Sequence, residues 1–220
     1  PESLVEDVQI ALGKALAKTV IGDPAQEGVR MGSLAGLKQR EEVKEKIREL
    51  AVAQEIVIGT MDEFEVVGAD PNKGAFLPPI VFRCDDPFNK TACHDIEAFG
   101  PVSTIIPYKD LDEAIKLSKM GKGSLVCSIT TYDDDIARDF VVSAATMHGR
   151  ILVLNRDCAK ESTGHGSPMP MLVHGGPGRA GGGEEMGGKR GVNHYMQRTA
   201  IQGSPTTLTH ITQNYQYGGE

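Results

Sequence analysis

The feature that most constrains the fold is a series of apolar strand patterns in the second half of the chain. They cover Val102–Tyr108, Leu125–Thr130 and Ile151–Asn155 and are rich in Val, Ile and Leu. Runs of this length and composition are typical of strands that are buried on both faces. The segments between them are long enough for helices, so each pair of strands requires a crossover connection rather than a hairpin.

Two amphipathic helices are predicted in those intervening segments. Asp110 and Glu113 form a capping box for the first, and the second runs from Asp133 to His148 with Gly149 as its C-terminal cap. Strand–helix–strand crossovers are right-handed and join parallel neighbours. The predicted class is therefore α/β, with a largely parallel sheet and flanking helices.

The first hundred residues add helices and shorter strands. An amphipathic helix is expected from Ser3, acting as N-cap, to about Thr19, and a second from Leu37 to about Ala53. Short strands are predicted at Glu55–Ile58 and Phe64–Val67. The prolines in Ala75–Phe82 allow only an edge strand or an extended entry to a strand.

Charge and cysteine content exclude several kinds of partner. The 220 residues carry a net charge of -7 and a pI of about 5.4, which disfavours nucleic acid and anionic membranes. No apolar run is long enough to cross a bilayer, and the four cysteines form no CxxC pair, so we expect a cytoplasmic protein with reduced thiols. The chain begins at Pro1 within a helix-entry pattern, which suggests a piece of a longer protein.

Glycine is concentrated in one segment near the C-terminal end, where eleven of the 26 glycines lie between Gly164 and Gly191. Gly176-Pro-Gly178-Arg-Ala-Gly181 matches the letters of a dinucleotide-binding fingerprint. A proline separates its first two glycines, however, and more glycine follows where a helix should open, so the pattern indicates backbone adaptability and little else. A loop of this length is expected to be either functional or disordered. A short helix near Val192–Gln197, a strand at Arg198–Ile201 and a helix from Pro205 are predicted after it.

Two pairs of sequence neighbours place a thiol beside a possible base or acid, namely Cys93-His94 and Asp157-Cys158. Neighbouring side chains on an extended chain point to opposite faces, so such pairs rarely form a working nucleophile. The competing prediction is that these thiols are inert and that Cys127 is a small buried hydrophobe on a strand.

The glycine-rich segment also contains histidines that suggest two further sites. Cys158, His165 and His174 could bind zinc through a loop, but their spacing is loose and we predict no metal site. A thiol hydrolase that pairs Cys158 with a loop histidine is a third alternative for the function.

The most specific motif is Ile96-Glu-Ala-Phe-Gly-Pro-Val102, which leads into a predicted strand. It resembles the Glu-x-Phe-Gly-Pro-Val segment of the aldehyde dehydrogenase superfamily. The resemblance continues, in order, through Val20–Pro24, Met31–Leu34, Phe76–Pro79 and Gly149–Asn155, and so covers nearly the whole chain. It implies an aldehyde dehydrogenase catalytic-domain fold, truncated on its N-terminal side.

The resemblance also implies roles for individual residues. Taken alone, Glu97 would be a solvated loop carboxylate and Phe99 a core aromatic. In the family, the matching glutamate holds the nicotinamide ribose of NADP or NAD, and the matching phenylalanine lies against the ribose and the ring. Glu185 resembles a glutamate discussed as part of a proton path, although Glu184 replaces the arginine that precedes it there.

The family organisation implies what this chain contains and what it lacks. Residues 1–197 would form a partial catalytic domain, and residues 198–220 an oligomerisation strand and tail, so we expect a homo-oligomer. The nucleophilic cysteine, the general-base glutamate and the nucleotide-binding domain would lie upstream, so no catalytic residue is predicted here and the chain is expected to be inactive alone.

The departures from ordinary members point to a substrate. The segment Pro170–Gly183 is similar to the dehydrogenase part of the bifunctional ring-opening protein of phenylacetate catabolism and to related semialdehyde dehydrogenases. These oxidise a CoA-thioester semialdehyde to the acid. His165 and His174 would then belong to a remodelled substrate loop, or be solvated loop histidines. The alternative is a non-catalytic binding or oligomerisation module with the same fold.

Overall fold

The computed structural model describes residues 1–62, 64–162, 164, 175–181 and 195–220. The chain divides into two compact units, Pro1–Lys109 and Asp110–Glu220, and each has its own cluster of buried apolar side chains. Within the described residues, no helix is both long enough and apolar enough to span a membrane.

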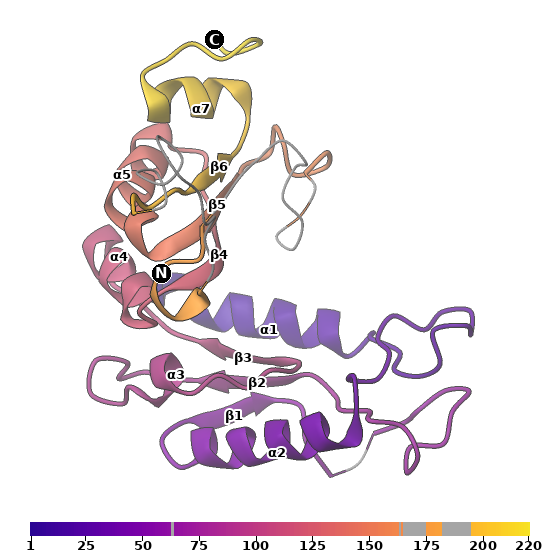
Figure 1. Cartoon of the computed structure of the whole chain (residues 1–220). Helices are drawn as coiled ribbons and strands as arrows, with labels where there is room; N and C mark the ends of the chain where they lie inside the picture. The colour runs from indigo at the N-terminus through magenta and orange to yellow at the C-terminus, as the bar shows by residue number, and fades with distance from the viewer. Residues whose placement is uncertain (63, 163, 165–174, 182–194) are drawn as a thin grey trace. The chain divides into compact units, whose positions relative to one another are not determined.

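A three-stranded sheet forms the centre of the first unit (Figure 1). Its order is β1 (Glu55–Ile58), β2 (Ile80–Arg83) and β3 (Val102–Ile105). The pair β2–β3 is parallel, as predicted for the sheet in general, whereas β1 runs antiparallel to β2. Because β2 is central, the prolines that precede it lie in an extended entry and not within an edge strand.

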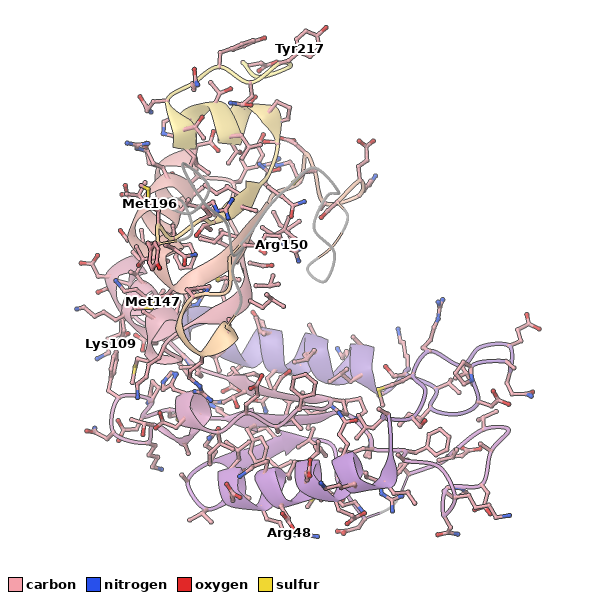
Figure 2. The ribbon with its side chains drawn as sticks, viewed as in Figure 1. Arg48, Lys109, Met147, Arg150, Met196 and Tyr217 are labelled. Carbon is pink, nitrogen blue, oxygen red and sulfur yellow. The ribbon has the colours of Figure 1, made fainter. Side chains whose placement is uncertain are left out.

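Helices α1 (Val5–Leu16) and α2 (Leu37–Ala51) lie on opposite sides of this sheet (Figure 1). On one face, three α2 side chains pack against β2 and its entry, and the cluster consists of Val43, Ile47, Leu50, Leu77, Ile80 and Phe82. Arg48 of α2 points away into solvent (Figure 2). On the other face, Arg83 of β2 forms an ion pair of 2.6 Å with Glu6 of α1. The alternation of β2 side chains thus connects both helices to one strand.

The second unit has a fully parallel sheet of β4 (Ser124–Thr130), β5 (His148–Leu154) and β6 (Ala200–Gln202). Its helices are α4 (Leu111–Met120), α5 (Asp134–Ala144) and α7 (Pro205–Thr212). Their apolar faces share a cluster with one side of β5, made up of Ile115, Ala137, Phe140, Val141, Ala144, Ile151, Val153 and Ile211. These three strands with crossover helices confirm the predicted α/β class.

Buried polar groups fix the C-terminal helix of this unit. Thr207 is almost fully buried, and its hydroxyl donates to Asp134 at 2.7 Å while it accepts from the Asn155 amide at 3.2 Å. Ser204 caps α7 by accepting from the Thr207 N–H. Each such bond contributes about 1 kcal/mol net, and losing one partner costs more because the other stays buried. Asn155, at the end of β5, thereby orients the chain that follows β6.

Side chains of the two β5 faces differ in polarity. Ile151 and Val153 face the helices, whereas His148 and Arg150 alternate with them and are also buried. The His148 Nδ1 lies 2.6 Å from the Ser124 hydroxyl, which links the starts of β4 and β5. Burial lowers the pKa of His148. The strand predicted at Ile151–Asn155 thus begins earlier, at His148, and its added part contains two buried polar residues, His148 and Arg150.

Several predicted boundaries are wrong. The helix expected to reach His148 ends at Ala144, and Gly149 lies within β5 because pairing with β4 already begins at His148. Ser3 is not an N-cap, since a 3-10 turn over Glu2–Leu4 precedes α1 and Leu4 holds the cap position. The strand expected at Phe64–Val67 is reduced to a single bridge between Val67 and Gly22. The first half of the helix expected near Val192–Gln197 lies outside the described residues, and its described half, residues 195–197, is not helical.

Candidate functional site

The candidate site is the segment that joins the short helix α3 (Ala92–Asp95) to β3. Its backbone is extended at Ile96, and its side chains alternate between core and solvent. Ile96 and Ala98 pack against the buried cluster of the first unit, whereas Glu97 is exposed and Phe99 has 74% of its surface exposed. Both side chains are therefore in solvent, and the expectation that Phe99 is a core aromatic is wrong.

A side chain of α2 holds the backbone of this segment. The Gln39 amide nitrogen donates to the carbonyl oxygen of Phe99 at 2.7 Å, and the Gln39 amide oxygen accepts from the Ala35 N–H at 3.1 Å. One half-buried glutamine therefore connects the entry of α2 with the segment that carries Glu97 and Phe99.

Gly100 ends the segment because the backbone lies directly on α2. A Cβ at this position would lie 2.9 and 3.0 Å from the two methyl carbons of Val43, which is 1% exposed. The Gly100 N–H donates to Ala98 at 2.7 Å, and the Val102 N–H donates to Gly100 at 2.8 Å, which turns the chain into β3. Packing thus accounts for Gly100 independently of any ligand, whereas the exposed Phe99 is not explained by the core.

This arrangement suits the nicotinamide half of a dinucleotide. An exposed carboxylate has two oxygens that can accept from neighbouring hydroxyls, as on a ribose. An exposed phenyl ring offers an apolar face to a flat heterocycle. Both groups lie on a backbone that is fixed by α2, so a bound ring would meet a preorganised surface.

The other predicted loop residues lie outside the described part of the chain. These are His165, His174 and Glu185. The zinc hypothesis with Cys158 depends on the same two histidines. Among the described residues, no group of three or more potential metal ligands is present.

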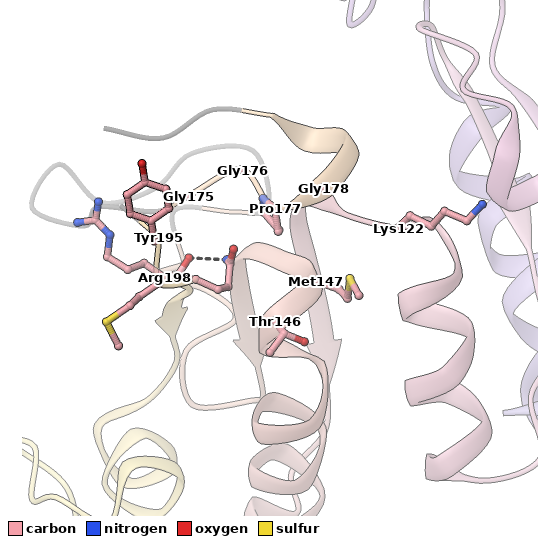
Figure 3. A pocket seen from close by; sticks show the side chains of 11 residues that line it. Lys122, Thr146, Met147, Gly175, Gly176, Pro177, Gly178, Tyr195 and Arg198 are labelled. Atoms are coloured by element: carbon pink, nitrogen blue, oxygen red, sulfur yellow. Dashed lines mark hydrogen bonds between the residues drawn. The ribbon is translucent and has the colours of Figure 1, made fainter. Parts of the chain in front are cut away.

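A separate cavity of about 450 Å³ lies within the second unit (Figure 3). One side of it, the glycine wall, consists of Gly175–Gly178. The other lining residues precede the three strands: Lys122 before β4, Thr146 and Met147 before β5, and Tyr195–Arg198 before β6. In Figure 3 the side chains of Lys122 and Arg198 extend away from the glycine wall in opposite directions. The cavity is at the amino ends of the strands, whereas ligands of parallel sheets bind at the carboxyl ends.

The glycines of this wall are required by close backbone contacts. Gly178 has a φ of +50°, and a Cβ there would lie 2.0 Å from the Lys122 oxygen, which accepts from the Arg179 N–H at 3.1 Å. The segment from Gly178 to Ala180 is a 3-10 turn of three residues and not the helix of a dinucleotide fingerprint. The interpretation of Gly176–Gly181 as adaptable backbone is consistent with this packing.

The neighbouring thiol pairs do not form nucleophile–base contacts. Cys93 donates to the Lys90 oxygen at 3.6 Å, while the His94 Nε2 lies 3.2 Å from the Pro87 oxygen. Cys158 donates to backbone carbonyls of β5, at 3.6 Å to Val153. Burial raises the pKa of Cys127 to about 11, as expected for an inert thiol on a strand.

Comparison with known proteins decides the family. Residues 1–201 match the model of the aldehyde dehydrogenase family. The chain belongs to this family. The match covers the segments on which the resemblance was based, including Ile96–Val102, and confirms it.

Two curated relatives are similar over most of the chain. "Protein MaoC" of Klebsiella aerogenes is 48% identical over 191 residues, which is 86% of this chain and 55% of that protein. The "3,4-dehydroadipyl-CoA semialdehyde dehydrogenase" of Aromatoleum evansii is 37% identical over 167 residues, which is 76% of this chain and 32% of that protein. The chain spans about half the length of the first relative and a third of the second.

Solved structures agree with the fold. Aldehyde dehydrogenase C of Pseudomonas syringae, in complex with NAD+ and octanal, matches with a TM-score of 0.66 at 25% identity. The matched region covers 89% of this chain and 36% of that chain. Succinic semialdehyde dehydrogenase of Streptococcus pyogenes, with NADP+ as the cofactor, matches with a TM-score of 0.65 at 19% identity. The matched region covers 88% of this chain and 38% of that chain. The predicted catalytic-domain fold is confirmed.

Sequence reasoning missed Gln39 and the contact of Gly100 with Val43. Gln39 is the one polar uncharged residue of α2, in a helix otherwise rich in Glu, Lys and Arg. A glutamine among charged residues was the available sequence signal, but Phe99, whose carbonyl oxygen it binds, is 60 residues away.

We predict that Gly100→Ala destabilises the chain by about 1–3 kcal/mol, because the new methyl group overpacks the buried Val43. Urea unfolding measures the loss, and adding Val43→Ala should relieve part of it because the two changes share one space. Gly121→Ala is the matched control, since a Cβ there meets nothing within 4 Å. Equal stability of the Gly100 and Gly121 variants would contradict the packing argument.

Proposed function

We propose that this chain is the cofactor-contact part of an NAD(P)-dependent aldehyde dehydrogenase, and that Glu97 and Phe99 contact the nicotinamide riboside. The observation that carries the proposal is that a carboxylate and a phenyl ring two residues apart are both exposed on a segment whose backbone is held by α2. The family match and the similarity to enzymes solved with NAD+ and NADP+ support it.

Different residues of the chain would orient different parts of the cofactor. Glu97 would accept hydrogen bonds from the ribose hydroxyls, and Phe99 would cover one face of the ring. Gln39 and Val43 would keep both at a fixed position through the backbone, which limits the loss of entropy when the complex forms. The nicotinamide, when bound, supplies the hydride acceptor of the reaction.

We propose a CoA-thioester semialdehyde as the substrate, oxidised to the carboxylic acid in phenylacetate-type catabolism. Support comes from the printed name of the relative from Aromatoleum evansii and from the 48% identity to Protein MaoC. His165, His174 and Glu185 remain proposed members of the substrate loop. The cofactor is NADP or NAD.

We place the nucleophilic thiol and the general base in the remainder of the parent protein. Cys84 is 1% exposed, Cys93 and Cys127 have raised pKa values, and Cys158 donates to β5 carbonyls, so none resembles an activated thiolate. Residues 198–220 would add an oligomerisation segment to the catalytic part, 1–197, of a cytoplasmic homo-oligomer, because β6 is the last strand of its sheet.

The isolated chain should therefore give no aldehyde-dependent reduction of NAD+ or NADP+, measured by the absorbance of the reduced nicotinamide. The complete parent protein under the same conditions is the positive control. Turnover by residues 1–220 alone would overturn the placement of the nucleophile and would favour an active thiol within this chain. Inactivity of both forms toward every semialdehyde would favour the alternative, a non-catalytic binding module.

In the complete protein, Glu97→Gln should raise the KM for NAD(P)+ about tenfold, since the charge-assisted hydrogen bonds to the ribose are weakened. Steady-state kinetics at varied cofactor concentration provide the measurement. Glu45→Gln, an exposed carboxylate on α2, is the matched control and should leave KM unchanged. The same KM in both variants would remove Glu97 from the cofactor site.

A further inference from the structure

Two thiols of the first unit meet at one carbonyl oxygen. Cys84 directly follows β2, and Cys93 lies in α3. Both donate to the Lys90 oxygen, Cys84 at 3.8 Å and Cys93 at 3.6 Å, and the Cys84 thiol is near enough to raise the pKa of Cys93. The shared acceptor thus places both sulfur atoms within 4 Å of one oxygen.

The two thiols differ in access. Cys84 is 1% exposed, whereas Cys93 is half-buried and open to small reagents. Burial, followed by the charge and the hydrogen bond of Cys84, raises the pKa of Cys93 to about 12, and Asp95 acts in the same direction. Cys93 is therefore protonated at neutral pH, and its reaction with a small disulfide is slow.

We propose that Cys84 and Cys93 form a reversible disulfide, and that its formation adjusts the loop that carries Glu97 and Phe99. The oxidant is a low-molecular-weight disulfide. The Cys93 thiolate attacks one of its sulfur atoms and releases one small thiol, which leaves a mixed disulfide on Cys93. The Cys84 thiolate then attacks the Cys93 sulfur and releases the second small thiol. Two protein thiols are oxidised, and one small disulfide is reduced to two thiols.

The position of Cys93 couples this bond to the candidate site. Cys93 belongs to α3, which ends at Asp95, directly before Ile96. A disulfide brings the sulfur atoms to about 2.05 Å, which draws α3 toward the end of β2 to the extent that side-chain rotation does not close the distance. Because Gln39 and Gly100 fix the far end of the segment, the shift is taken up around Glu97. This last step rests on the proposed function.

The bond itself is tested on the 220-residue chain, without any activity. The chain is incubated with oxidised glutathione at mildly alkaline pH and then mapped by peptide mass spectrometry under non-reducing conditions. We expect one disulfide, Cys84–Cys93, with Cys127 and Cys158 still alkylated by a thiol reagent, and full reversal by dithiothreitol. Retention of both free thiols, or a disulfide that involves Cys127 or Cys158, would overturn the proposal.

Single variants separate the two thiols. Cys84→Ser, with Cys84→Ala as a second choice if the serine disturbs folding, should stop at a glutathione mixed disulfide on Cys93. Cys93→Ser should prevent any reaction at Cys84, because that sulfur is buried. Cys127→Ser is the matched control and should form the disulfide normally. A mixed disulfide on Cys84 in the Cys93 variant would contradict the assigned order of attack.

The effect on the site is tested in the complete enzyme. The KM for NAD(P)+ should change at least twofold between the reduced and the oxidised form, and this change should be absent in Cys84→Ser. An unchanged KM with a mapped disulfide would overturn the coupling to Glu97. A failure of Glu97→Gln to alter KM would instead concern the proposed function, while the mapping of the disulfide would stand.

Discussion

The packing of α2 on the segment Ile96–Gly100 is the constraint on which the candidate site depends. Val43 leaves no room for a side chain at Gly100, and Gln39 binds the Phe99 oxygen. The core therefore takes up Ile96 and Ala98, and the two intervening side chains are left in solvent. Exposing a phenyl ring is unfavourable for a chain on its own, so the arrangement is one that a ligand would stabilise.

Because the candidate site depends on the packing of α2, the stability of the first unit and the geometry of the site are connected. Val43, which belongs to the cluster that buries Ile80 and Phe82 of β2, also contacts Gly100 at the end of the segment that carries Glu97. A site built on a packed helix retains its geometry without the ligand, which lowers the cost of binding. The thiols at the end of β2 and in α3 lie at the α3 end of the segment, opposite the end where Gln39 and Val43 contact it.

Sequence periodicity predicted the elements better than their ends. The strands at Leu125–Thr130 and Ile151–Asn155 and the capping of α4 by Asp110 follow from local pattern and agree with the structure. Gly149 was misplaced because a parallel partner strand, which no local pattern reveals, extends β5 by several residues.

The candidate site also depends on contacts that the local sequence pattern does not reveal. Taken alone, Phe99 was expected in the core, since a single aromatic residue carries no sign of which side it faces; only the family motif pointed to its exposure. Gln39 and Gly100 depend on contacts between segments about 60 residues apart, and the pairing of Cys84 with Cys93 depends on a loop whose path is set by tertiary packing.

The most direct test is a crystal structure of the complete parent protein with bound NAD+ or NADP+. The account predicts that a Glu97 oxygen lies about 2.7–3.0 Å from a hydroxyl of the nicotinamide ribose, with the Phe99 ring against the nicotinamide and the Gln39 bond unchanged. A nicotinamide that binds away from Glu97 and Phe99 would contradict it.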